Sequence, residues 1–77
     1  MKNTNDLIEL GLRIRKIRKE RGLTQEQLAG EAGLDRSYVG GIERGERNIT
    51  FSVLCQIVSA LGVDVAYVTS GLPGDAK

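Results

Sequence analysis

The sequence has no histidine and a single cysteine, Cys55. One cysteine excludes an internal disulfide and any zinc site built from several cysteines, and the lack of histidine removes the commonest metal ligand and proton shuttle. The Ser, Asp and Glu side chains that are present have no phosphate-binding loop or metal cluster to order them. We therefore expect no cofactor, no metal and no enzymatic activity, and we assign Cys55 to the core.

Long apolar runs are also missing. No stretch approaches the roughly 20 apolar residues of a membrane span. The N-terminal residues 1–6 are polar, whereas a signal peptide needs an apolar segment. We therefore expect a cytoplasmic protein with no membrane partner.

The 77 residues suffice for one domain, 1–77, with a small core. A chain of this length buries only about 60% of the surface that its unfolded form exposes. Because oligomerisation commonly supplies the missing apolar burial, we expect a homodimer. So small a core leaves little room for an effector pocket, and we expect no small-molecule effector.

The net charge is only +1, but ten of the eleven basic residues precede Ile49. Six of these ten fall between Arg13 and Arg21. Such a cluster is compatible with a nucleic-acid partner, and it is equally compatible with the solvated face of a helix. Charge alone does not decide between the two.

Apolar periodicity predicts an all-α protein with five helices. Leu7, Leu10, Ile14 and Ile17 step by three, four and three residues, which predicts one buried face on a helix over about 6–21. The other predicted helices span about 25–31, 36–44, 51–61 and 64–70, and a frayed tail is expected over about 72–77.

Start and stop residues support these helices. Thr24 followed by Gln27 forms a capping-box pattern at the start of the second helix. Asp35 and Thr50 are well placed to cap the third and fourth helices. Gly33 permits a tight left-handed turn between the second and third helices.

The most informative unit spans about residues 25–44. Ala29 is small enough for two helices to cross closely, Gly33 takes the turn, and Val39 supplies the apolar side chain that fixes the next helix. Together these residues satisfy the geometry of a helix-turn-helix. An ordinary helical hairpin in a bundle is the alternative.

Over residues 14–68 the sequence resembles the lambda-repressor-like, or xenobiotic-response-element (XRE), helix-turn-helix family. The likeness is carried by segments 14–19 (IRKIRK), 22–29 (GLTQEQLA), 32–34 (AGL), 42–45 (IERG) and 60–63 (ALGV). Within that family, the segments most similar to the controller proteins of restriction-modification systems are 34–39, 41–44 and 47–50.

The resemblance implies a compact five-helix domain that binds double-stranded DNA and regulates transcription. A controller would be a homodimer on a palindromic operator upstream of its own gene, with half-sites about 10 bp apart and RNA polymerase as a further partner. Phage and plasmid repressors share much of the same sequence, and an antitoxin-type module would use the fold to bind protein. Both remain alternatives.

By the same resemblance, the third helix would enter the major groove with Arg36 and Ser37 at base edges. An arginine can donate two hydrogen bonds to guanine. The alternative for Arg36 is a solvated side chain or a partner of Asp35. Contacts to the DNA backbone would come from Gln25, Tyr38, Arg44, Arg47 and Asn48. For Tyr38 the alternative is a cover over the core, and for the loop residues 47–48 an ordinary polar loop.

The remaining assignments concern structure. The resemblance implies an ion pair between Arg18 and Glu43 that ties the first helix to the third. Gly40 and Gly41 each cost a helix roughly 0.5–1 kcal/mol relative to alanine, and our hypothesis is that they allow close approach to DNA, whose shape then supplies part of the specificity. The resemblance also implies dimerisation through the C-terminal helix, with Val65, Tyr67, Val68 and Leu72 as candidate contacts.

Overall fold

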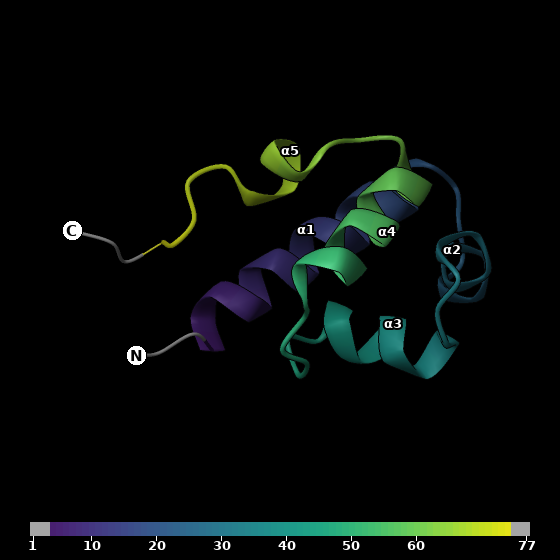
Figure 1. Cartoon of the computed structure of the whole chain (residues 1–77), viewed down its shortest axis with the longest axis horizontal. Coiled ribbons are helices and arrows are strands. Elements are labelled where there is room, and N and C mark those ends of the chain that lie inside the picture. The colour runs from purple at the N-terminus through teal and green to yellow at the C-terminus, as the bar shows by residue number, and fades with distance from the viewer. Residues whose placement is uncertain (1–3, 75–77) are drawn as a thin grey trace.

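The computed structural model describes residues 4–74, which form five α-helices and no strand (Figure 1). The prediction of an all-α fold is confirmed for this part of the chain, and each helix boundary falls within two residues of the expected one. None of the helices in residues 4–74 has the length and apolar character that a membrane span requires. The helices are α1 (Thr4–Glu20), α2 (Gln25–Ala32), α3 (Arg36–Glu43), α4 (Phe51–Leu61) and α5 (Val65–Thr69).

The predicted caps are present. The backbone N–H of Gln27 donates to Oγ1 of Thr24 at 3.0 Å, and the backbone N–H of Thr24 donates to Oε1 of Gln27 at 2.8 Å, which completes the capping box. Asp35 caps α3 and Thr50 caps α4. Gly33 ends α2 with φ +73°, a left-handed conformation that favours glycine.

One core joins all five helices. Its largest fully buried side chains include at least one residue from each helix, and α4 contributes two. Burial of each such side chain stabilises the fold by about 1.5–3 kcal/mol relative to leaving it exposed. These residues are Ile14, Leu28, Val39, Ile57, Leu61 and Val68.

The backbone of α1 lies directly against the C-terminal end of α3. A Cβ atom on Gly11 would lie 2.4 Å from the carbonyl oxygen of Ile42 and 2.6 Å from that of Glu43, so only glycine fits there. Gly45, which follows α3 with φ +75°, lies against Ile8 in the same way, with a Cβ position 2.7 Å from the Ile8 Cα. These two glycines fix the position of α3.

In the view of Figure 1, α3 lies below α1 and α5 lies above it. Arg13 of α1 holds α5 in place, because its Nη1 donates to the carbonyl oxygens of Val68 at 3.0 Å and Ser70 at 2.7 Å. Arg21 similarly donates from Nε to the carbonyl oxygen of Leu61, near the end of α4, at 3.0 Å.

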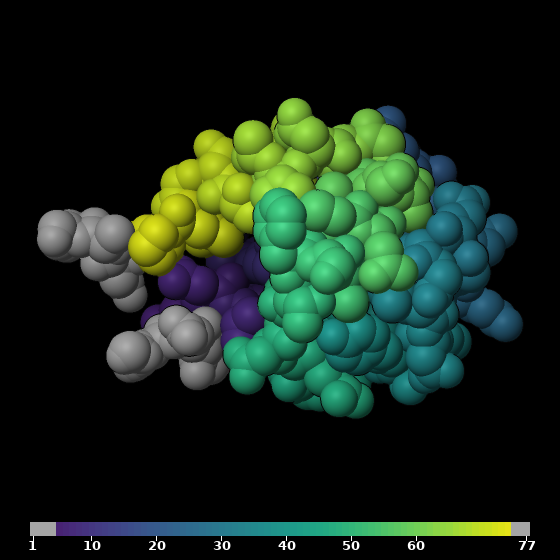
Figure 2. All heavy atoms as spheres, in the orientation of Figure 1, coloured from purple at the N-terminus to yellow at the C-terminus, as the bar shows by residue number. Residues whose placement is uncertain are grey.

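The segment after α5 returns along α1 toward the N-terminal end of that helix (Figures 1 and 2). Leu72 is half-buried against the core, and the backbone N–H of Gly74 donates to Oδ1 of Asp6 at 2.9 Å. The prediction of a frayed tail is therefore wrong for residues 72–74, because both packing and a hydrogen bond hold them. The remainder of that prediction, residues 75–77, lies outside the described residues.

Candidate nucleic-acid interface

Helix α3 has one face in the core and the opposite face toward solvent. Val39 and Ile42 are buried apolar residues of its inner face. With about 3.6 residues per turn, Ser37, Gly41 and Arg44 fall on the opposite side, within about 60° of one another. Arg36 is exposed at the N-terminal end of the helix. The outward face is thus the surface on which α3 can meet a partner.

Arg36 is available for binding. Among residues 4–74, no hydrogen bond or ion pair uses its guanidinium, so pairing with Asp35 does not occur. Asp35 accepts instead from the backbone N–H of Ser37 at 3.3 Å and from the Ser37 hydroxyl. Since the hydroxyl proton is used, Ser37 offers a partner its acceptor lone pairs.

A buried junction connects α1, α2 and α3. Arg18 donates from Nε and Nη2 to the two carboxylate oxygens of Glu43, at 2.7 and 3.0 Å, in a bidentate pair whose side chains are 9% and 2% exposed. Arg18 also donates to the Leu23 carbonyl oxygen at 2.8 Å. The hydrogen bonds to Glu43 raise the pKa of the Arg18 guanidinium. The expected Arg18–Glu43 pair is present, and it sets the position of α3.

Gln25 belongs to this junction. Its Nε2 donates to Oε1 of Glu43 at 3.0 Å, so one N–H of its amide group is used inside the protein. The side chain is half-buried at the start of α2, with Oε1 3.5 Å from where a Cβ of Gly40 would lie. The second N–H of the amide remains for a ligand.

Gly40 and Gly41 are buried, which contradicts our hypothesis that they themselves approach DNA. Side chains of the protein cover them. A Cβ on Gly40 would lie 3.2 Å from Nη1 of Arg44, and a Cβ on Gly41 would lie 3.0 Å from Cγ and 3.1 Å from Nε of Arg47. The glycines therefore leave room for two arginines to lie along α3.

The other expected contacts to the DNA backbone surround this face. Tyr38 is half-buried against the core, and Cζ of Arg47 lies 5.3 Å from the centre of its ring. Arg44 forms an exposed ion pair with Glu46, with Nε 3.2 Å from Oε2. Asn48 is exposed in the loop between α3 and α4. Exposed polar side chains thus continue from α3 into the loop.

The candidate dimer residues differ in their exposure. Tyr67 is 62% exposed, whereas Val65 and Leu72 are half-buried against the core. Val68 is fully buried in the core of its own chain, so assigning it to a dimer contact was wrong. Phe51 is 69% exposed, and the sequence analysis missed it. The available signal for its exposure was its position directly after the N-cap Thr50, in the first turn of α4.

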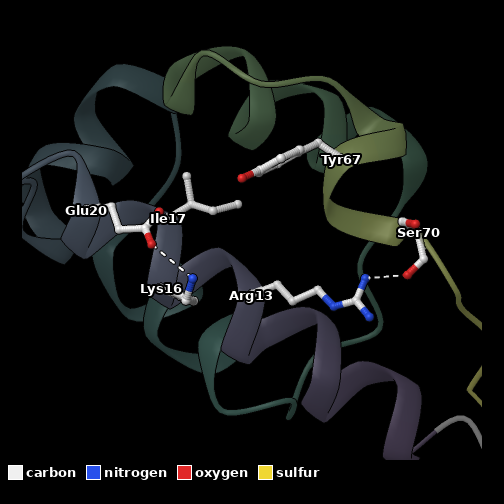
Figure 3. A pocket seen from close by; sticks show the side chains of 6 residues that line it. All are labelled: Arg13, Lys16, Ile17, Glu20, Tyr67 and Ser70. Carbon is white, nitrogen blue, oxygen red and sulfur yellow. Dashed lines mark hydrogen bonds and ion pairs between the residues drawn. The ribbon is translucent and has the colours of Figure 1, made fainter.

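An open groove of about 340 Å³ separates α1 from α5 (Figure 3). Tyr67 projects over it from α5, across from Ile17 of α1. Lys16 is paired with Glu20 at 3.0 Å, and this contact raises the pKa of the lysine. Arg13 also donates a hydrogen bond to the carbonyl oxygen of Ser70, so most polar residues that line this groove interact with one another.

Comparison with known proteins agrees with this geometry. A family model described as helix-turn-helix matches residues 14–68, the region that holds the core, the junction and α3. The chain belongs to the helix-turn-helix family.

Curated relatives of this helix-turn-helix protein are regulators by name. The immunity repressor protein of Bacillus phage phi105 is 49% identical over 59 residues, which cover 77% of this chain but 41% of the repressor. Control protein C.SmaI of Serratia marcescens is 46% identical, with 68% and 62% covered. Control protein C.MunI of Mycoplasma sp. is 37% identical, with 88% and 95% covered. The chain thus spans less than two thirds of the first two relatives and nearly all of the third.

Solved structures give the same fold. The restriction-modification controller protein C.AhdI from Aeromonas hydrophila superposes with a TM-score of 0.82 at 44% identity, over 83% of this chain and 97% of the controller. The controller C.Esp1396I, as a tetramer in complex with its natural 35 base-pair operator, superposes with a TM-score of 0.75, also at 44% identity, over 80% and 82%. The helix-turn-helix protein therefore has the fold of these controllers.

Proposed function

We propose that this protein is a sequence-specific regulator of transcription that binds double-stranded DNA, of the controller type found in restriction-modification operons. The observation that carries the proposal is Arg36. Its guanidinium is exposed and unpaired within residues 4–74, at the N-terminal end of a helix that a buried ion pair fixes in place. An arginine held in this way can donate two hydrogen bonds to O6 and N7 of guanine in the major groove.

The relatives support this function. The C.Esp1396I controller binds an operator, and structures of it carry substitutions at an arginine, a threonine and a tyrosine that are consecutive in its chain. Arg36, Ser37 and Tyr38 follow the same order here, with serine in place of threonine. Arg36 and Ser37 then read bases, and Ser37 does so as an acceptor.

Residues around α3 hold the DNA backbone. Gln25 offers an amide N–H beside the N-terminus of α2, where the helix dipole favours a phosphate. Tyr38, Arg44 and Asn48 present a hydroxyl, a guanidinium and an amide along the same surface, and contacts of this kind fix register without reading sequence. Arg47 reaches the outward face of α3 from the loop.

The regulator acts as a homodimer on a palindromic operator. Tyr67 is the exposed centre of the dimer contact, with Val65 and Leu72 beside it. In Figure 1, α5 lies above α1 and α3 below it, so a dimer formed through α5 leaves both copies of α3 free. The protein works in the cytoplasm with RNA polymerase as a further partner and has neither enzymatic activity nor a small-molecule effector.

The test is a footprint and gel-shift titration of the purified protein on DNA from upstream of its own gene, against a scrambled duplex. We expect protection of two half-sites about 10 bp apart. Arg36→Ala should lose the preference for this DNA and keep binding that weakens with salt. Arg15→Ala, which removes an exposed arginine from α1, is the matched control and should keep the preference.

Other outcomes separate the alternatives. Protection of DNA from elsewhere in the genome, with none upstream of its own gene, would favour a repressor of phage or plasmid type over a self-regulating controller. No binding to any duplex would contradict the proposal, and mass measurement of copurifying proteins would then test a protein-binding role of the antitoxin type.

A further inference from the structure

Gly41 occupies the middle of the outward face of α3, between Ser37 and Arg44. A side chain here would project toward whatever α3 binds, yet the residue supplies none. It is nevertheless buried, because the side chain of Arg47 lies across it, with Cγ 3.0 Å and Nε 3.1 Å from the Cβ position. Arg47 therefore fills the place that a longer residue at position 41 would occupy.

Two features keep Arg47 in this place. Its guanidinium carbon lies 5.3 Å from the centre of the Tyr38 ring, within the range in which a cation is attracted to an aromatic face. The loop that carries it is anchored to α3, since the backbone N–H of Glu46 donates to the carbonyl oxygen of Gly41 at 2.9 Å. Arg47 thus lies on α3, although it follows the helix in sequence.

The guanidinium of Arg47 also has no hydrogen-bond or ion-pair partner within residues 4–74. Among residues 4–74, no carboxylate pairs with it and no hydrogen bond uses its N–H groups. Arg44 beside it differs, because it is paired with Glu46. The guanidinium group presents its donors in a planar fork, and guanine presents the pair of acceptors that this fork fits.

We propose that Gly41 is a specificity-determining position, whose missing side chain seats Arg47 on the outward face of α3, where Arg47 reads a base edge. Arg47 is then a second reader beside Arg36, and Gly41 acts as a positioning residue through it. This inference rests on the proposed function. It also gives a role to a helix-weakening glycine at this point of α3.

The test uses the full chain and sites selected from randomised duplex DNA, with wild type, Arg47→Ala, Gly41→Ala and the double variant titrated on the selected site and on a scrambled duplex at several salt concentrations. We expect Arg47→Ala to lower the preference for the selected site by roughly 5- to 150-fold. One base position should lose its preference in a repeated selection.

Gly41→Ala should lower the same preference by a smaller factor, because an added Cβ forces Arg47 to shift. In the Arg47→Ala background, Gly41→Ala should have no further effect on preference, as a double-mutant cycle would measure. Arg15→Ala should leave the preference unchanged. Thermal unfolding of each variant checks that the fold is kept.

Two outcomes would overturn the inference. Equal loss of affinity by Arg47→Ala on selected and scrambled DNA, with a salt slope reduced by about one, would make Arg47 a phosphate contact only. An effect of Gly41→Ala that persists at full size without Arg47 would remove the positioning role. If wild type selects no sequence at all, the proposed function itself fails, and the inference fails with it.

Discussion

Two groups of arginines in this protein differ in whether their guanidinium groups are used within the fold. Arg13 and Arg18 of α1, and Arg21 directly after it, all donate hydrogen bonds within the protein, to carbonyl oxygens or to a buried carboxylate. Around α3, Arg36 and Arg47 make no such bond within residues 4–74. Three of the six basic residues in the densest basic stretch therefore hold the helices together, whereas Arg36 and Arg47 lie on the outward side of α3 with their guanidinium groups available to a ligand. Charge density along a chain does not locate its binding surface.

The largest expected effect comes from removing Arg18, the buried member of the group of arginines that hold the helices together. Arg18→Met should lower the free energy of unfolding by about 3–5 kcal/mol, because it leaves the buried carboxylate of Glu43 without its partner. Urea unfolding measures the change. Lys16→Met, which removes one member of the exposed pair with Glu20, is the control and should leave stability unchanged. Similar stabilities for the two variants would contradict a structural role for the buried pair.

A second substitution tests the backbone contact between α1 and α3. Gly11→Ala should lower the free energy of unfolding by about 1–3 kcal/mol, because the new methyl group would meet the carbonyl oxygens of Ile42 and Glu43. Gly30→Ala is the matched control in α2, where nothing lies within 4 Å of the Cβ position. It should raise stability by about 0.5–1 kcal/mol. Thermal unfolding of both variants would show whether the signs differ as expected.

For the arginines around α3, substitution should impair DNA discrimination and leave stability nearly unchanged. Arg36→Ala should cost about 1–3 kcal/mol of discrimination between operator and scrambled DNA. Its free energy of unfolding should change by less than about 0.5 kcal/mol, since the side chain is exposed and makes no hydrogen bond or ion pair within residues 4–74. Parallel binding and urea titrations measure both quantities. A loss of stability without a loss of discrimination would place Arg36 with the arginines that stabilise the fold and not with those that bind DNA.

The smallest expected effect concerns Arg13. Arg13→Ala should lower the free energy of unfolding by about 1 kcal/mol, because it removes the hydrogen bonds to Val68 and Ser70 that hold α5. Since these bonds support the candidate dimer contact, the dimer should dissociate at a higher protein concentration than wild type does, as sedimentation would measure. Base preference should be unchanged, and Arg15→Ala should alter neither quantity.

Local features of the fold were predictable from the sequence. Helix boundaries depend on caps and apolar spacing within a few residues of chain, so Thr24, Asp35 and Thr50 could be assigned in advance. The ion pair of Arg18 with Glu43 depended on family resemblance, because the two residues are 25 positions apart. The exposed α3 residues were expected, and what they bind is still a prediction.

Features that depend on contacts between distant elements were not predictable in the same way. Nothing near Gly11 in the sequence indicates that another helix end will lie against it, and Gly41 gave no sign that Arg47 would cover it. Val68 belongs to an apolar pattern typical both of a core and of an interface, and burial decides between them. Such assignments require the three-dimensional arrangement.

The junction of Arg18, Glu43 and Gln25 also has a consequence for motion. Because it joins three helices through one carboxylate, α3 cannot separate from the rest of the protein without exposing a buried charge. Partial opening of α3 is then nearly as costly as global unfolding, so its amide protons should exchange with solvent only when the whole domain unfolds. The domain should behave as a single cooperative unit, and the recognition surface should already be ordered before a ligand arrives.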